Sequence, residues 1–480
     1  MSKQFNPNRR SFIQNLALLT GGSALLSSYG NLQLIQSAFS APIGYTGLTD
    51  NKSLVCIFLL GGNDSLNTLI PYTNADYQKY ANVRQNLAIA HQQLLPVNGN
   101  QYGFHPSLPG LRTLYNEGRL AVASNIGNLF EPITRDAYFN YLDGNNPGLN
   151  IPPDLFSHNH QMEIWQTNLA PKPGTINAGW GGTMNDLLVS ANSNPDIPSA
   201  FTIAGNNLWQ AGATTRSFGI QPGAGIDNFG ALEDDSWPTW QSSRAEAWNK
   251  ILNLPRTDVL QTQAANSFLD TQSRANYLRT AFQQAPAFQT PYNDRNSLAS
   301  QLRTVATMIA ARDSLGLKRQ TFFVSAGPYD THGDQLGVHS GLLAQLDEAL
   351  VSFQRTLEEI GVEESVTTFT ASEFGRTLTS NGNGTDHAWA TDYLVMGGAV
   401  DGGKIHGETI QYSDVPQGQH LTEKLFGPQD VGSGRFIPAY STDQYGATLA
   451  KWMGINDSDL DTIFPNLRHF PVQNLGFMRS

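Results

Sequence analysis

Runs of apolar residues alternate with amphipathic segments along most of the chain. Residues 53–60 are apolar almost without interruption, and shorter β-prone runs cover 119–124, 321–325, 365–370 and 393–396. A strand that is buried on both faces of a parallel sheet has this continuous apolar pattern. These runs are therefore predicted to be strands of one central sheet.

The segments between the predicted strands have the residue spacing of helices. Residues 341–359 repeat apolar side chains from Leu342 to Phe353 on one helical face. Shorter helices are predicted over 105–118 and 156–167. Strands that alternate with helices indicate an α/β fold, with a mostly parallel central sheet that is flanked by helices.

Residues 170–300 differ in composition from the rest of the chain. They are rich in Asn, Gln, Ser and Trp, and they show little strand pattern. Helices are expected near 242–252 and, running past the end of the segment, over 293–311. We interpret 170–300 as an insertion that caps the site, within one domain over 41–480. The alternative is a second surface layer that does not contact the site.

The N-terminus has the pattern of an export signal. Arg9 and Arg10 precede an apolar stretch that ends near Leu26, and the arginine pair resembles a twin-arginine signal. Residues 1–40 are predicted to be removed after Ser40, so the protein is expected to be periplasmic or secreted and to meet the twin-arginine export machinery. The alternative is an ordinary amphipathic helix. No later run reaches about 18 apolar residues, so no stable membrane span is expected.

The charge and cysteine content exclude several classes of protein. Only 14% of the residues are charged, and 29 basic against 40 acidic residues give a formal charge of −11. A protein that binds nucleic-acid phosphates would need a basic surface. The single cysteine, Cys56, lies within the first apolar run, where a buried thiol is expected. This excludes a disulfide scaffold and any cysteine-rich zinc or iron–sulfur site.

Four polar clusters lie next to the predicted strands, over 61–65, 330–335, 372–376 and 386–387. In an open α/β sheet, ligands bind outside the carboxyl ends of the strands. The carboxylates and imidazoles of these clusters suit zinc, manganese or iron, whereas calcium would want more oxygen ligands. An Asp after a strand can also serve only as the N-cap of a helix. Four clusters at one sheet edge favour a metal site.

The same clusters carry a resemblance to a known family. Leu-Leu-Gly-Gly-Asn-Asp-Ser-Leu-Asn-Thr, Asp-Thr-His-Gly-Asp-Gln, Ser-Glu-Phe-Gly-Arg-Thr and Gly-Asn-Gly-Thr-Asp-His-Ala-Trp occur in that order. With the paired arginines and Ser157-His158, they resemble the bacterial family called domain of unknown function 1501. The resemblance covers most of 50–455 and is weakest in 170–300. It implies the layered fold of the alkaline phosphatase and sulfatase superfamily.

The resemblance also implies a set of metal ligands. Phe374 stands where that superfamily has a histidine after its acidic ligand. A single-metal site, an altered second site or a pseudoenzyme is compatible with this departure. The ion is expected to be divalent, with zinc first and manganese, iron or calcium as alternatives. The implied ligands are Asp64, Asp330, His332, Glu373 and His387.

The nucleophile implied by the resemblance is Ser157, which stands at the start of a predicted helix. The free N–H groups of a helix N-terminus suit a phosphate or sulfate oxyanion. His158 or the metal could activate the hydroxyl. Arg376 could pair with an anionic ester or simply form a salt bridge with a carboxylate. Ser157 could equally serve only as a helix cap.

Two functions remain open from the sequence. The first is an exported metal-dependent hydrolase of phosphate or sulfate esters that acts on a small anionic substrate. The second is a non-catalytic exported binding protein that keeps the fold and at most one metal. His339 is a reserve candidate for a metal ligand, and His105 is a weaker one.

Overall fold

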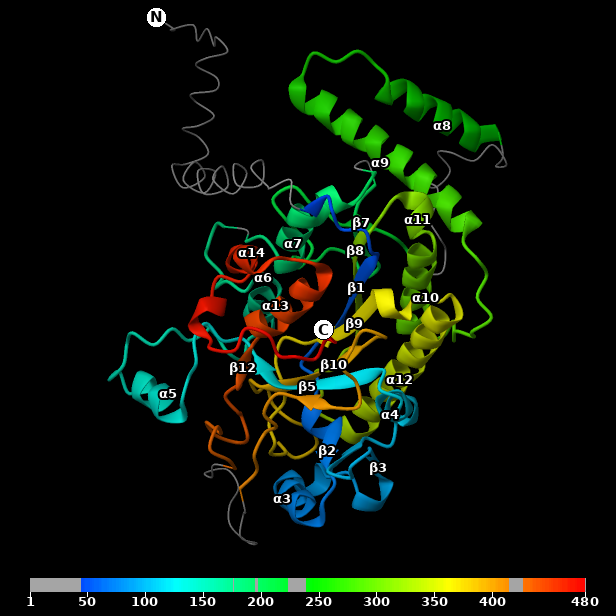
Figure 1. Ribbon diagram of the computed structural model, residues 1–480. Coiled ribbons are helices and arrows are strands. Elements are labelled where there is room, and N and C mark those ends of the chain that lie inside the picture. The colour runs from blue at the N-terminus through cyan, green and yellow to red at the C-terminus, as the bar shows by residue number, and fades with distance from the viewer. Residues whose placement is uncertain (1–44, 176, 195–196, 223–238, 414–425, 480) are drawn as a thin grey trace, which may run out of the picture.

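The computed structural model describes residues 45–479, except 176, 195–196, 223–238 and 414–425. The predicted export signal over 1–40 therefore lies outside the described residues. A central sheet runs through the molecule (Figure 1). Its order is β11 (Ile405–His406), β5 (Leu120–Gly127), β10 (Thr391–Met396), β9 (Val366–Ala371), β1 (Lys52–Leu59), β8 (Arg319–Ala326), β6 (Ala200–Thr202) and β7 (Phe218–Gly219), and β12 (Tyr440–Ser441) also pairs with β5.

The sheet is mostly parallel, as the apolar runs predict. β1 pairs in parallel with β8 on one side and with β9 on the other, and seven of its eight residues are buried. β10 is the exception, because it runs antiparallel to both β9 and β5. The start of β10 therefore lies at the sheet edge where β1, β8 and β9 end.

Helices cover both faces of the sheet (Figure 1). Val55 and Ile57 of β1 face α10 (Ser297–Ala310) and α12 (Gln335–Glu359), and α4 (Pro109–Asn116) packs on the same side. The opposite face carries α13 (Thr442–Met453), α6 (His158–Thr167), α7 (Trp180–Leu188) and α14 (Asp457–Ile463). The predicted layered α/β architecture is thus confirmed, and the Cys56 thiol is free and buried in the second of these layers.

Two smaller units flank the sheet. β2 (Leu69–Pro71), β4 (Tyr102–Phe104) and β3 (Leu95–Pro96) form a second, antiparallel sheet, and α3 (Asn74–Arg84) packs against β2. α5 (Arg135–Leu142) lies apart from the central sheet (Figure 1).

The segment 170–300 contributes to the sheet as well as to its surroundings. It includes α7, β6 and β7, then α8 (Thr239–Leu252) and α9 (Val259–Gln284). α9 contacts α11 (Arg312–Leu315), where the Tyr277 hydroxyl donates to the Ser314 carbonyl. Because α11 directly precedes β8, α9 lies by the start of that strand. The site was predicted at the other end of β8. The positions of α8 and α9 therefore do not support the prediction that they cap it.

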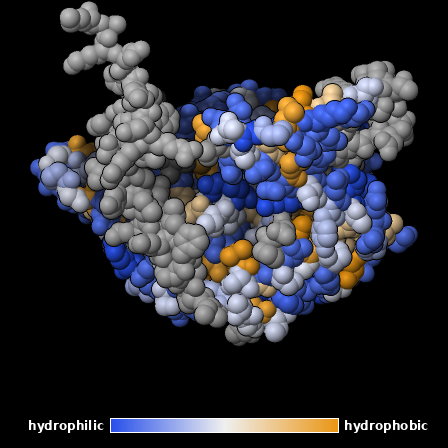
Figure 2. Space-filling model, turned by 90° about the horizontal axis from the view of Figure 1, so that it is seen from above, coloured by the Kyte–Doolittle hydropathy of each residue, from blue (hydrophilic) through white to orange (hydrophobic). Residues whose placement is uncertain are grey.

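One face of the described chain is mainly polar. Figure 2 shows one face that is largely hydrophilic, with separate hydrophobic spots. Among the described residues, no helix combines the length and the apolar character needed to cross a bilayer.

Candidate metal centre

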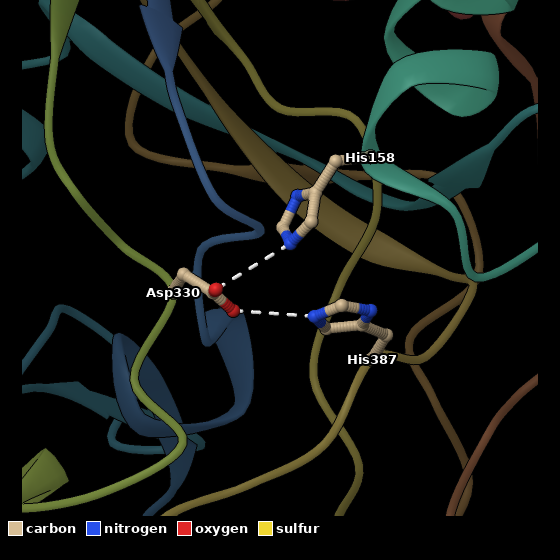
Figure 3. Close-up of side chains that lie close together, drawn as sticks. All are labelled: His158, Asp330 and His387. Atoms are coloured by element: carbon tan, nitrogen blue, oxygen red, sulfur yellow. Dashed lines mark hydrogen bonds and ion pairs between the residues drawn. The ribbon is translucent and has the colours of Figure 1, made fainter.

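Three residues from distant parts of the chain meet at the edge where the parallel strands end. His158 is the first residue of α6, Asp330 follows β8 by four residues, and His387 precedes β10 by four. Their side chains point toward one another, with the Asp330 carboxylate facing a ring nitrogen of each histidine (Figure 3). One ligand atom from each lies within 4.8 Å of the others.

The spacing of the ligand atoms fits one metal ion. His332 Nε2 lies 2.9 Å from His387 Nε2, and Asp330 Oδ1 lies 3.1 Å and 3.2 Å from these two nitrogens. His158 Nε2 lies 3.5 Å from Asp330 Oδ2. In a tetrahedral zinc site with bonds of about 2.0–2.1 Å, the ligand atoms are about 3.3 Å apart. His158, Asp330 and His387 are therefore the set whose ligand atoms lie close enough to share one ion, and His332 lies beside two of them.

The second ring nitrogen of two histidines is held by the protein. His387 Nδ1 lies 2.8 Å from the Phe156 carbonyl oxygen, which can only accept, so Nδ1 donates and Nε2 keeps its lone pair. His158 Nδ1 lies 2.7 Å from Glu373 Oε1. Such partners of metal-bound histidines fix the ring orientation and the tautomer. Both rings are therefore oriented to present Nε2 to the centre.

The pKa values of the two histidines are shifted in opposite directions. Burial lowers the pKa of His387, although the hydrogen bond to the Phe156 carbonyl opposes this. The hydrogen bond with Glu373 raises the pKa of His158, against the opposing effect of burial. Because a metal binds neutral imidazole, an ion at this centre has to displace a proton from His158 more often than from His387.

Asp330 stays ionised although it is partly buried. Burial alone would raise its pKa, but the hydrogen bond from Arg376, the charge of that guanidinium and the nearby His387 and His332 outweigh this and hold the pKa below its ordinary value. His332 is the most exposed member of the set, and its Nδ1 lies 3.4 Å from Asp386 Oδ1. The lowered pKa favours the ionised form of Asp330, which is the form that binds a cation.

Arg376 forms the salt bridge with a carboxylate that the sequence analysis gave as the alternative to binding an anionic ester. Its side chain is completely buried, and its nitrogens donate to the carbonyl oxygens of Gly62, Gly61 and Thr385 and to Asp330 Oδ1. A guanidinium whose three nitrogens all have protein acceptors is not free to pair with an anionic ester. Arg376 instead ties the turn after β1 to Asp330 and holds the carboxylate in place.

Asp64 also departs from its predicted role as a metal ligand. Its Oδ1 lies 2.5 Å from Arg84 Nη2, and both side chains are completely buried. Its Oδ2 accepts from Gln335 Nε2 at 2.5 Å. Both carboxylate oxygens are thus used by protein donors, so Asp64 forms a buried ion pair beneath the centre.

Glu373 lies beside the centre and contacts a ligand. Its Oε1 accepts from His158 Nδ1 and, at 2.9 Å, from the backbone N–H of Gly61. The sequence correctly placed Glu373 at this edge, but these contacts support a role as the partner of His158 and not as a ligand. His158 was expected to activate the Ser157 hydroxyl. The structure instead places it among the candidate metal ligands.

Aromatic packing and close backbone contacts shape the centre. The Phe374 ring stacks on His387 with centroids 4.6 Å apart, and it lies 4.9 Å from the His158 ring. Gly61 has φ +112°, and a Cβ on it would lie 2.4 Å from the backbone nitrogen of Asp330. Only glycine allows the turn after β1 to approach Asp330 this closely.

Ser157 occupies the N-cap position of α6, but its side chain makes no capping hydrogen bond. Its neighbours in sequence are Phe156, whose carbonyl accepts from His387, and His158. Ser157 therefore lies in the chain between a candidate ligand and the residue whose carbonyl holds His387. His339, the reserve ligand, is instead buried at 3.0 Å from Asn63 Oδ1, and burial lowers its pKa to about 4.

The charges around the centre favour a divalent cation. Asp330, Glu373 and Asp386 are three carboxylates, and the guanidinium groups of Arg376 and Arg435 lie beside them, so the formal charge of these five groups is −1 when the imidazoles are neutral. A donor set of imidazole nitrogens with one carboxylate suits zinc, iron or manganese better than calcium.

Comparisons with known proteins add a family and distant structural likenesses. A family model described as a protein of unknown function, DUF1501, matches residues 51–427. No curated protein matches the sequence.

Among solved structures, a sulfatase from Pseudoalteromonas is similar at 10% identity and a TM-score of 0.35, over 96% of this chain and 77% of its own. The lipoteichoic acid synthase of Listeria monocytogenes is similar at 9% identity and a TM-score of 0.36, over 90% of this chain and 78% of its own. At these scores the chemistry of the chain has to be argued from its own residues.

Proposed function

This chain belongs to the DUF1501 family, whose description assigns no function, and we propose that it is an exported, metal-dependent hydrolase of phosphate or sulfate esters. The observation that carries the proposal is the meeting of His158, Asp330 and His387 at the sheet edge (Figure 3). His332 lies beside Asp330 and His387 and is proposed as a further ligand. Imidazole nitrogens with one carboxylate suit zinc first, with manganese or iron as alternatives.

A divalent cation bound here would polarise the ester and draw its anionic oxygens to the centre. The protein supplies the fixed geometry, because Glu373 and the Phe156 carbonyl orient His158 and His387, and Arg376 orients Asp330. The first-turn N–H groups of α6 are not capped by Ser157, and they lie at the positive end of the helix dipole. They are suited to hold an oxyanion.

Ser157 is proposed as the attacking group. Its Oγ forms a bond to phosphorus or sulfur while the bond from that atom to the alcohol oxygen breaks, and the hydroxyl proton passes to the departing alcohol. Water then releases the phosphate or sulfate and restores the hydroxyl. The sum is ester plus water giving alcohol plus the inorganic anion, and direct attack by water gives the same sum.

The proposal is tested with purified protein that has been loaded in turn with zinc, manganese and iron and assayed on aryl phosphates and sulfates. We expect hydrolysis by the wild type, loss of metal and activity in Asp330→Asn, and loss of activity with metal retained in Ser157→Ala. Asp334→Asn is the matched control, because this exposed residue of the same loop has φ 48°, which Asn tolerates.

Two outcomes would change the proposal. A fully loaded wild type that hydrolyses no ester of the panel would contradict a hydrolase and favour a non-catalytic metal-binding protein. A Ser157→Ala variant as active as the wild type would show that water attacks directly.

Export is proposed from Arg9 and Arg10, which lie outside the described residues. Replacing both arginines by lysine should retain the protein in the cytoplasm, as measured by cell fractionation. Unchanged export of that variant would contradict a twin-arginine signal.

A further inference from the structure

A cavity of about 400 Å³ lies at the same end of the sheet as the metal centre. Leu60, directly after β1, and Tyr329, beyond the end of β8, are among its lining residues. The next residue in each case belongs to the centre, because Gly61 donates its backbone N–H to Glu373 and Asp330 is a candidate ligand. One turn of backbone thus separates the cavity from the centre.

The lining of the cavity is neutral and partly apolar. None of its lining residues carries a charged side chain, and α10 and α12 contribute Leu298, Leu342 and Leu346. The amide of Gln301 is already paired, since its Nε2 donates to the Ser325 carbonyl at 2.9 Å and its Oε1 accepts from the Ser325 N–H at 3.0 Å. The interior therefore offers mainly apolar surface.

The cavity is not built for an anion, although the start of α10 lines it. The backbone N–H groups of Leu298 and Ala299 donate to Asn296 Oδ1 at 3.1 Å and 3.3 Å, so this helix terminus is already capped. Ser297 and Gln345 are exposed at the lining and can hydrogen-bond a neutral polar group. An uncharged occupant with an apolar body fits these features.

We infer that this cavity receives the neutral, partly apolar alcohol portion of the ester, such as an aryl group, while the anionic portion lies at the metal centre. The inference rests on the proposed hydrolase function for its link to catalysis. The volume is within the range of small-molecule sites, about 300–1,000 Å³. An alcohol group held here would lie across the Gly61 turn from the residues that bind the anionic group.

A binding experiment tests the cavity without requiring hydrolysis. The probe is para-fluorophenol, a neutral aryl alcohol, and its affinity is measured by fluorine NMR titration. Leu342→Trp fills the space between α10 and α12, and it should weaken binding by roughly tenfold or more because apolar contact area is lost. Ala344→Trp is the matched control, since Ala344 is exposed on the same helix and does not line the cavity.

Asp330→Asn separates this inference from the proposed function. This variant is expected to lack metal yet bind para-fluorophenol as the wild type does. If the wild type hydrolyses esters, Leu342→Trp should raise KM for an aryl ester and leave KM for a methyl ester unchanged. If the protein hydrolyses no ester and still binds the probe in this pattern, only the proposed hydrolase function is contradicted.

Three results would overturn the inference. They are a wild type that does not bind para-fluorophenol, a Leu342→Trp variant that binds it as well as the wild type does, and a control variant that loses binding equally. Should Leu342→Trp fail to fold, Gln345→Trp at the exposed lining of the same cavity takes its place. The same weakening of binding is expected from it.

Discussion

At the scale of single residues, Glu373 acts on the centre through His158. Its carboxylate lies 2.7 Å from His158 Nδ1, and its side chain is 1% exposed. Carboxylates that hold a metal-bound histidine typically contribute 10- to 100-fold to metal affinity, so Glu373→Gln should weaken zinc binding by about that factor. Competition against a chromophoric chelator measures it. The control is Glu364→Gln, which changes a carboxylate that is 61% exposed. Equal zinc affinities in the two variants would mean that Glu373 does not position His158.

Asp64 is expected to matter for stability and not for the metal. Removing one member of a buried ion pair leaves the other charged and unpaired, at a cost of about 3–5 kcal/mol. Asp64→Asn should therefore lower the free energy of unfolding by about this amount, as measured by urea denaturation of the metal-free protein. Its zinc affinity should stay within a few-fold of the wild type.

The double variant Asp64→Leu with Arg84→Met provides the matched comparison. It removes both charges, so it should be more stable than Asp64→Asn. A loss of zinc binding in Asp64→Asn without any loss of stability would restore Asp64 as a ligand.

Sequence position indicated some of the residues that meet at this edge and not others. Asp330, His332 and His387 could be predicted because each lies next to a strand end with a distinct apolar run. The partner of Asp64 is Arg84, at the end of α3 and 20 residues away, and no local pattern links the two. His158 and Glu373 are 215 residues apart, so their pairing depends on the whole fold.

At the scale of elements, the direction of β10 decides where His387 lies. The loop that carries His387 precedes β10. In a fully parallel sheet, this loop would therefore lie at the opposite edge from Asp330. The antiparallel pairing of β10 with β9 and β5 brings it to the correct edge. An apolar run predicts a strand but not the direction of that strand. β6 was not predicted, because its three residues are too few to form a recognisable run.

The first turn of α13 contains a buried carboxyl that makes stability depend on pH. Burial raises the pKa of Asp443 to about 8. Its Oδ1 accepts from the Asn466 N–H at 3.2 Å, and its Oδ2 has no hydrogen-bond partner among the described residues. A raised pKa in the folded state gives a stabilising contribution that is complete below the unfolded value of about 3.9 and is lost as pH rises to about 8.

Asp443→Asn should remove this dependence, because an amide does not ionise. Between about pH 4 and pH 8, the free energy of unfolding should fall more steeply for the wild type than for the variant. Urea denaturation at several pH values measures both slopes. Parallel slopes would show that Asp443 is ionised in the folded protein.

At the scale of the whole molecule, the centre joins three distant segments of chain: the start of α6, the loop after β8 and the loop before β10. A ligand set of this kind exists only in the folded protein, so metal binding and folding are linked. The helices on both faces hold the strand ends that carry these loops. The layered fold was predictable from the alternation of apolar runs, whereas the arrangement of the candidate ligands required the folded structure.

The most direct test of the metal centre is anomalous X-ray diffraction from crystals of the zinc-loaded protein. The account predicts one anomalous peak within about 2.0–2.2 Å of His158 Nε2, His387 Nε2 and an Asp330 oxygen. His332 Nε2 is predicted as the fourth protein ligand, and Glu373 is predicted to contact only His158. A zinc peak bound by Asp64 or directly by Glu373, or no peak among these histidines in protein that carries stoichiometric zinc, would contradict the account.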